Sequence, residues 1–239
     1  MESVKHIVNK KDNKVIPNFH NQLLYVETKI SSSDLEELKN KAKYCLENQN
    51  NFIKTNSTLV GNMEKEFRLN ESFEEIIFPY TSFLADEYVK LKNNVSAVPY
   101  GVTLKNQSNT EKQVWVNTNS WINFQKKHEF NPMHNHTGNY SFVLWIQIPY
   151  DLEEELKLDN CVNSHFKRNS LFCFSYLNQF GNIVEDVLDI DKTWEGTMIL
   201  FPSSLEHQVY PFFTSDDYRI SISGNIIGMP ESKKTFSYQ

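Results

Sequence analysis

Cysteine and arginine are scarce in this 239-residue chain, and it has no long hydrophobic run. The three cysteines, Cys45, Cys161 and Cys173, are far apart and form no C-x-x-C pair. This pattern argues against a disulfide scaffold or a zinc ribbon and favours a reducing compartment, so we expect a cytoplasmic protein. No segment approaches the roughly 20 apolar residues that span a bilayer, and the N-terminal residues are too polar for a secretory signal. We therefore expect no membrane association.

Positive charge is also in short supply. The chain has 24 Lys and Arg residues against 30 Asp and Glu residues, which gives a net charge of −6. A protein that binds nucleic acid without sequence preference needs clustered cations for the phosphates, so we expect no such binding. Only Arg68, Arg168 and Arg219 are arginines. Because the chain otherwise uses lysine, we expect arginine where a planar, bidentate guanidinium is required.

The first 95 residues favour helices. Residues 31–49 predict a helix capped by Ser32 or Ser33, with apolar residues on one side. A second helix is predicted within residues 72–92, and Pro79 should break or kink it. Residues 21–30 are a candidate strand.

Beyond about residue 95, short β-branched and aromatic runs alternate with Gly, Pro, Asn and Asp, which is typical of a sandwich or barrel. These runs are 114–124, 139–149, 170–177, 182–190, 196–202, 207–213 and 218–227. The acidic insertion at 150–169 is expected to be a solvated loop. We find no repeat and no long linker, so we expect a single domain over 1–239, with helix-rich support in 1–95 and the β core in 96–230.

His134 and His136 form an H-x-H pair just before a strand-like run. On an extended backbone, side chains two residues apart point to the same side, so both imidazoles can address one point. Two polar loop residues ahead of a strand would give the same pattern. A metal site in a barrel mouth needs a further ligand from a non-adjacent strand. His207 follows His134 by 73 residues, at the start of a later strand, and supplies a candidate.

Polar residues occupy one face of the last predicted strand. In the run R-I-S-I-S-G-N, Arg219, Ser221, Ser223 and Asn225 share this face. Burying an unpaired guanidinium is costly, so an inward Arg219 would need an anionic partner. A protein carboxylate or a bound ligand could provide it; alternatively, the strand is an edge strand with Arg219 in solvent.

Taken in order, these elements resemble the iron(II)- and 2-oxoglutarate-dependent oxygenases, and most closely a prolyl-hydroxylase-related branch found in bacteria and tailed phages. The segments that carry the resemblance are W-I-N (121–123), H-N-H-T-G-N-Y-S (134–141), the strand ending at Pro149, G-T-M-I-L-F-P-S-S-L-E-H (196–207), Val209, Pro211 and R-I-S-I-S-G-N (219–225). The resemblance covers about residues 121–226, whereas the first 95 residues match only loosely.

The resemblance implies an α+β chain with a double-stranded β-helix core of the jelly-roll or cupin-like type and N-terminal supporting helices. It also implies a dioxygenase, a hydroxylase that releases succinate and CO₂. By match, His134, His136 and His207 bind Fe(II), and with Arg219 they form the catalytic set. Arg219 holds the distal carboxylate of 2-oxoglutarate, and Ser221 donates beside it. Ascorbate is a candidate further cofactor, and a phage-encoded protein would work in the host cytoplasm.

Three further residues are secondary candidates for contacts with the co-substrate or the substrate. Asn123 and Tyr140 flank the expected pocket and are candidates for hydrogen bonds to the co-substrate, although strand packing explains them equally well. Asn225 is a candidate substrate contact at the far end of the Arg219 face. The substrate, a small molecule or a peptidyl group, is not identified by the sequence, and neither is the oligomeric state.

One residue departs from the pattern of the wider superfamily, in which the middle metal ligand is a carboxylate. Here it is His136, as the related branch also carries. With a third imidazole in place of the carboxylate, the site has one negative charge fewer and is less selective among Fe, Co, Ni and Zn. Alternatively, Glu129 or a water completes the ligand shell and His136 supports it from outside.

Other classes of protein stay open at this point. A non-catalytic jelly roll could bind zinc or nickel structurally, and a cupin-like metal protein could run different chemistry without an oxo-acid. A phage structural or adhesion protein could reuse the same sandwich, but it would leave Arg219 without an anionic ligand.

Overall fold

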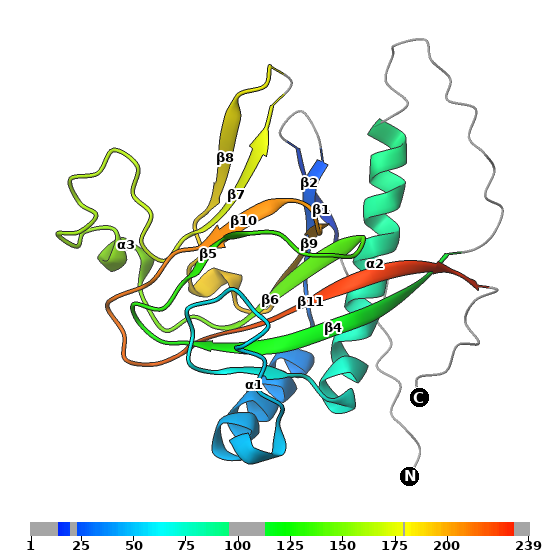
Figure 1. Cartoon of the computed structure of the whole chain (residues 1–239), viewed down its shortest axis with the longest axis horizontal. Helices are drawn as coiled ribbons and strands as arrows, with labels where there is room; N and C mark the ends of the chain where they lie inside the picture. Colours follow the sequence, from blue (N-terminus) through cyan, green and yellow to red (C-terminus); the bar gives the residue numbers. More distant parts are fainter. Residues whose placement is uncertain (1–13, 20–22, 96–112, 179, 232–239) are drawn as a thin grey trace.

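Two antiparallel β-sheets form the centre of the protein (Figure 1). The computed structural model describes residues 14–19, 23–95, 113–178 and 180–231. The larger sheet has the strand order β1-β2-β9-β6-β11-β4-β3, and the smaller sheet has the order β5-β10-β7-β8. The strands are β1 (Ile16–Phe19), β2 (Leu23–Lys29), β3 (Glu66–Arg68), β4 (Gln113–Gln125), β5 (Asn131–His134), β6 (Tyr140–Gln147), β7 (Phe172–Leu177), β8 (Ile183–Leu188), β9 (Thr197–Pro202), β10 (Glu206–Val209) and β11 (Arg219–Pro230).

Strands β4 to β11 wind from one sheet to the other and back. β4, β6, β9 and β11 lie in the larger sheet, and β5, β7, β8 and β10 lie in the smaller one. As a result, β11 pairs with both β4 and β6, and β10 pairs with both β5 and β7. This winding is a double-stranded β-helix, and it confirms the fold class expected from the sequence.

The N-terminal part adds strands as well as helices. The expected early strand is β2, which pairs with β9, and the short β3 pairs with β4 at the opposite side of the larger sheet. Helix α1 (Ser32–Glu47) confirms the first predicted helix, but its cap is Ser31, whose Oγ accepts from the backbone N–H of Asp34. The division into support and core stays a prediction, and residues 96–112 lie outside the described residues.

Helix α2 (Glu71–Val95) runs through Pro79, so of the two predicted effects of this proline, a break or a kink, the break is wrong and the kink stays a prediction. A proline inside a helix removes one backbone hydrogen bond. Residues on both sides of it, among them Ile76, Ile77, Tyr80 and Leu84, are buried in the core cluster. This burial holds both halves of the helix against the sheet and compensates for the lost bond.

Two hydrophobic clusters hold the layers together. One lies between the helices and the larger sheet, and the other includes residues of both sheets, such as Tyr25, Trp145, Phe174 and Phe201. Gly224 allows β11 and β6 to approach closely, because a Cβ there would lie 2.6 Å from the ring of Phe142. The sheets therefore meet over a largely aromatic interior, and the pocket opens into that interior.

The sequence predicted that the acidic insertion is a solvated loop, but part of it is buried. It contains helix α3 (Leu152–Glu155), whose last residue, Glu155, is 0% exposed. The carboxylate of Glu155 accepts hydrogen bonds from the backbone N–H groups of Phe213 and Thr214 and from the Thr214 hydroxyl. Glu155 thus anchors the loop between β10 and β11, whereas Glu153 and Glu154 are exposed.

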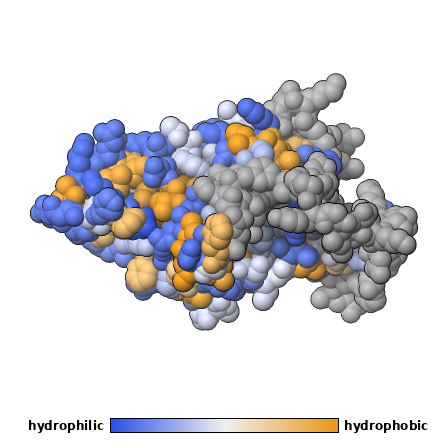
Figure 2. All heavy atoms as spheres, turned by 90° about the horizontal axis from the view of Figure 1, so that it is seen from above, coloured by the Kyte–Doolittle hydropathy of each residue, from blue (hydrophilic) through white to orange (hydrophobic). Residues whose placement is uncertain are grey.

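The surface carries scattered apolar residues. Strands β7 and β8 form a hairpin that extends away from the sheets (Figure 1), and Leu177, Phe180 and Ile183 near its tip are exposed. On the face seen in Figure 2, apolar and hydrophilic side chains are interspersed. Among the described residues, no helix is long and apolar enough to cross a membrane.

Candidate metal and co-substrate site

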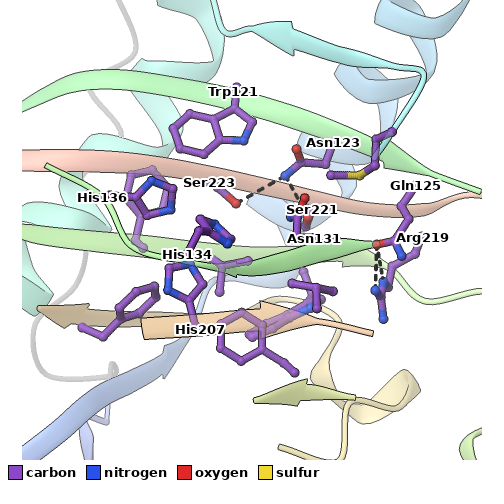
Figure 3. A pocket seen from close by; sticks show the side chains of 17 residues that line it. Trp121, Asn123, Gln125, Asn131, His134, His136, His207, Arg219, Ser221 and Ser223 are labelled. Carbon is purple, nitrogen blue, oxygen red and sulfur yellow. Dashed lines mark hydrogen bonds between the residues drawn. The ribbon is translucent and has the colours of Figure 1, made fainter. Parts of the chain in front are cut away.

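Three histidines meet in a pocket lined by residues of both sheets (Figure 3). His134 ends β5 and is the direct partner of His207 on β10, and their ring centroids are 4.3 Å apart. His136 follows β5, where its backbone N–H donates to the carbonyl of Ser203. Its ring lies 4.9 Å from that of His134 and 5.1 Å from that of His207. One potential ligand atom from each residue lies within 4.8 Å of the other two.

Backbone carbonyls orient two of the three rings. Nδ1 of His134 lies 2.7 Å from the carbonyl oxygen of Pro132, and Nδ1 of His207 lies 2.9 Å from that of Leu205. A carbonyl oxygen only accepts, so each Nδ1 carries the proton and leaves Nε2 as the metal-binding atom. The ring of His136 instead packs near Trp121, at a centroid distance of 5.6 Å.

Burial keeps the three imidazoles neutral. His207 is 4% exposed and lies among the rings of Phe172, Phe174 and Phe201. Burial, followed by the nearby charge of His134, lowers the pKa of His207 to about 3. The same two causes lower the pKa of His136 to about 4, and burial also lowers the pKa of His134. Neutral imidazole is the form that binds metals, so the set is ready for a cation at neutral pH.

The donor set fits a divalent transition metal. Within the part of the chain that the structure describes, the cluster contains no carboxylate. Glu129, the alternative ligand considered from the sequence, is not in it, and its two carboxylate oxygens accept from the backbone N–H groups of Glu64 and Lys126. Three imidazoles suit iron, zinc, cobalt and nickel, so the residues present can hold Fe(II) without being selective for it.

A narrow pocket connects the histidines with Arg219. Figure 3 shows the three histidines on one side and Arg219 on the other, with Ser221 and Asn123 between them. Arg219 and Ser221 project inward from β11, opposite Gln125 and Asn123 of β4. The floor of the pocket is therefore polar, although Trp121, Trp145, Phe172 and Phe201 also line it.

The guanidinium of Arg219 is 3% exposed and bonded only to neutral acceptors. Nε and Nη2 donate to Oε1 of Gln125, at 3.1 and 2.7 Å. Nη1 donates to the hydroxyl of Tyr150 and the carbonyl of Ser170, and Nη2 also donates to the carbonyl of Tyr210. No carboxylate of the described residues forms an ion pair with it, so the guanidinium presents a positive charge to the pocket.

Asn123 orients the serine hydroxyls of the floor. Its Nδ2 donates to Oγ of Ser221 at 3.2 Å and to Oγ of Ser223 at 3.4 Å. Each hydroxyl thus receives a bond from Asn123, which leaves its own proton free to donate elsewhere. The Oδ1 atom of Asn123 is buried and has no hydrogen-bond partner.

Two sequence candidates lie outside this pocket. Tyr140 does not line it; its ring packs against Tyr88 and Trp115 in the cluster beneath the helices. Asn225 does not line it either, and its Oδ1 accepts from the buried hydroxyl of Ser141.

Sequence reasoning missed Gln125, Met63 and Tyr150. Gln125 lies two residues after Asn123 on β4, so strand alternation could have found it. Met63 lines the pocket from the N-terminal part, and Tyr150 reaches Arg219 from the segment after β6. No spacing in the sequence connects these two residues with the histidines.

Fold and site together define a double-stranded β-helix with a candidate metal site and a cationic pocket. The sequence model of a family described as "Putative 2OG-Fe(II) oxygenase" matches residues 119–225, a segment that includes the three histidines and Arg219. Over this segment the chain is similar in sequence to the 2OG-Fe(II) oxygenases. The family description names Fe(II) and 2-oxoglutarate, and the three histidines in the matched segment are a set that could hold the iron.

Solved structures similar to this chain include a prolyl hydroxylase from Trichoplax adhaerens in complex with a hypoxia inducible factor peptide. It has 14% identity and a TM-score of 0.48, over 97% of this chain and 89% of that one. A prolyl-4-hydroxylase from Pseudomonas putida has 11% identity and a TM-score of 0.47, over 84% and 90%. A 2OG-Fe(II) oxygenase family oxidoreductase from Burkholderia pseudomallei has 10% identity and a TM-score of 0.37, over 92% and 76%. No curated protein matches the chain.

Proposed function

We propose that the protein hydroxylates an organic substrate in this pocket, with His134, His136 and His207 as metal ligands and Arg219 as the anchor for the distal carboxylate of 2-oxoglutarate. The observation that carries the proposal is the buried guanidinium, which has no protein carboxylate and shares one pocket with three neutral imidazoles. A dicarboxylate can satisfy both ends of this pocket at once.

Each residue has a separate task in this proposal. The carbonyls of Pro132 and Leu205 fix the rings of His134 and His207 so that both Nε2 atoms are available. Arg219 binds one carboxylate by charge and by its planar donors. Ser221, whose hydroxyl proton is left free by Asn123, donates to the same carboxylate.

When bound, Fe(II) and 2-oxoglutarate would supply the oxidising chemistry: dioxygen would give one oxygen atom to the substrate as a hydroxyl and one to succinate, with release of CO₂. The protein positions these groups and limits the access of water. The aromatic residues Trp121, Trp145, Phe172 and Phe201 line the pocket and lower its polarity around the histidines. This environment favours reaction of the bound substrate over loss of the oxidant to solvent.

The location in the cytoplasm is part of the proposal. All three cysteines are buried and free, which suits a reducing compartment. We define the substrate only as an organic molecule or a peptidyl group, since in such folds the loops at the rim of the pocket determine which substrate binds.

Succinate release tests the proposal. Purified protein with Fe(II), ascorbate and 2-oxoglutarate in air should release succinate slowly even without its substrate. Arg219→Ala should abolish this release while the protein still binds Mn(II). Folded, metal-loaded wild-type protein that releases no succinate and binds no 2-oxoglutarate would contradict the proposal and favour a non-catalytic or cupin-like metal protein.

A further inference from the structure

Arg219 is fully hydrogen-bonded in the structure, although it is the group expected to bind a carboxylate. A guanidinium has five N–H donors. All five are used, on Gln125, Tyr150, Ser170 and Tyr210. A carboxylate that binds Arg219 through two parallel hydrogen bonds must therefore replace one of these acceptors.

Gln125 holds the edge that a carboxylate would take. The two donors Nε and Nη2 form one of the bidentate edges of a guanidinium, and a carboxylate binds this edge with both of its oxygens. In the structure both donors go to a single atom, Oε1 of Gln125. The other three donors go to the Tyr150 hydroxyl and to two backbone carbonyls, and backbone carbonyls move less easily than a side chain.

The orientation of the Gln125 amide is determined by its neighbours. Its Nε2 donates to the backbone carbonyl of Glu129 at 2.5 Å, and its Oε1 accepts from Arg219. Reversing the amide would bring two donors together at Arg219 and two acceptors together at Glu129. Gln125 is also the direct cross-strand partner of Arg219 in the β4–β11 pairing, which places both side chains on the same face.

We propose that Gln125 is a specificity-determining residue for the co-substrate, because its amide oxygen is a neutral, displaceable stand-in for the distal carboxylate of a 2-oxo diacid. It keeps the guanidinium oriented without cancelling its charge. A carboxylate forms stronger, charge-assisted hydrogen bonds with the same edge and displaces the amide. A 2-oxo monoacid has no second carboxylate and forms no such hydrogen bonds with Arg219, so the pocket should bind diacids more tightly than monoacids. This inference rests on the role proposed for Arg219.

Two variants of Gln125 test the inference by opposite effects. Gln125→Glu keeps the shape but places a negative charge on Arg219, and Gln125→Leu keeps most of the volume but removes the competing oxygen. The probes are 2-oxoglutarate and 2-oxopentanoate, which has the same five carbons but ends in a methyl group. Their binding to Mn(II)-loaded protein is measured by calorimetry without oxygen.

Gln125→Glu should weaken the binding of 2-oxoglutarate at least tenfold, and Gln125→Leu should strengthen it several-fold. Neither variant should change the binding of 2-oxopentanoate or of Mn(II) more than twofold. Thermal melting verifies that the variants are folded. A merely structural role of Gln125 would shift both ligands together, and that result would overturn the inference.

The failure of the proposed function has a different signature. In that case wild-type protein would bind both probes equally, and Arg219→Lys would not lower the preference for the diacid. If the wild type prefers 2-oxoglutarate and Arg219→Lys loses this preference, the role of Arg219 stands. An unchanged preference in both Gln125 variants would then overturn the inference about Gln125 alone.

Discussion

His134 and His207 are direct partners across the β5–β10 pairing, and each ring donates its Nδ1–H to the carbonyl two residues before it in the chain. The same local hydrogen bond, on two adjacent strands, thus fixes both rings and leaves their Nε2 atoms available to bind a metal. His136 has no corresponding carbonyl among its contacts in the described structure; its ring packs near Trp121.

This difference predicts unequal effects of ligand variants. His136→Asp should keep Mn(II) affinity within about tenfold of wild type, because a carboxylate suits the same position on a metal held by two imidazoles. His134→Ala and His207→Ala should each lower it more than about 100-fold. Calorimetry with Mn(II) measures the affinities. Loss of metal from His136→Asp in a protein that melts like wild type would contradict the assignment.

Buried Glu66 predicts a pH dependence of stability. Its side chain on β3 is 1% exposed, and burial, together with the charge of Glu129, raises the pKa of Glu66 to about 7. A carboxyl group with a raised pKa in the folded state stabilises the fold below its unfolded pKa of 4.5, and this contribution is lost as the pH rises through about 7.

Glu66→Gln should therefore increase the free energy of unfolding at pH 8 by about 3 kcal/mol relative to wild type, with little change at pH 4.5. Urea unfolding at several pH values measures both proteins. The comparison isolates Glu66 because every other titrating group is common to both. Parallel curves for the two proteins between pH 4.5 and 8 would show that folding does not raise the pKa of Glu66.

The buried carboxylate of Glu155 predicts that replacing this residue lowers the free energy of unfolding strongly, although it lies in a run of acidic residues. Glu155→Ala leaves the N–H groups of Phe213 and Thr214 and the Thr214 hydroxyl without their acceptor. We expect a loss of about 3 kcal/mol in the free energy of unfolding. Glu154→Ala, one residue earlier and exposed, is the matched control and should change stability by less than about 0.5 kcal/mol. Equal effects would contradict the buried anchor.

Gly224 predicts a steric effect at the centre of the larger sheet. Gly224→Ala would place a methyl group 2.6 Å from the Phe142 ring and from Oγ of Ser120, and we expect a loss of about 2 kcal/mol in the free energy of unfolding. Adding Phe142→Leu should recover part of this loss, since it removes the ring edge. Strictly additive losses in the double variant would indicate that the two positions do not interact.

Much of the fold follows from the sequence because local patterns determine it. Short apolar runs bounded by turn residues marked β4, β6 and β7 to β11. The three histidines were predictable as a group because a metal site in such a core needs ligands from more than one strand, and the resemblance supplied their order.

The remaining features depend on distant parts of the chain. Glu155 sits in an acidic run that resembles a solvated loop, and only the loop at Phe213 explains its burial. Tyr150 and Ser170 reach Arg219 from the two sides of the insertion. Tyr140 packs against Tyr88, and Asn225 accepts a hydrogen bond from Ser141, because the far side of each strand meets partners that strand alternation alone does not reveal.

The flanking strands β2 and β3 have a practical consequence for the catalytic half of the molecule. β2 covers β9 and β3 covers part of β4, so N-terminal chain shields the backbone hydrogen-bonding groups on both borders of the strands that form the site. A fragment trimmed to residues 119–225 would expose both borders to other fragments and would lose Met63 from the pocket wall. Such a fragment should aggregate, so a soluble fragment of the site should also include the segment from β2 to β3.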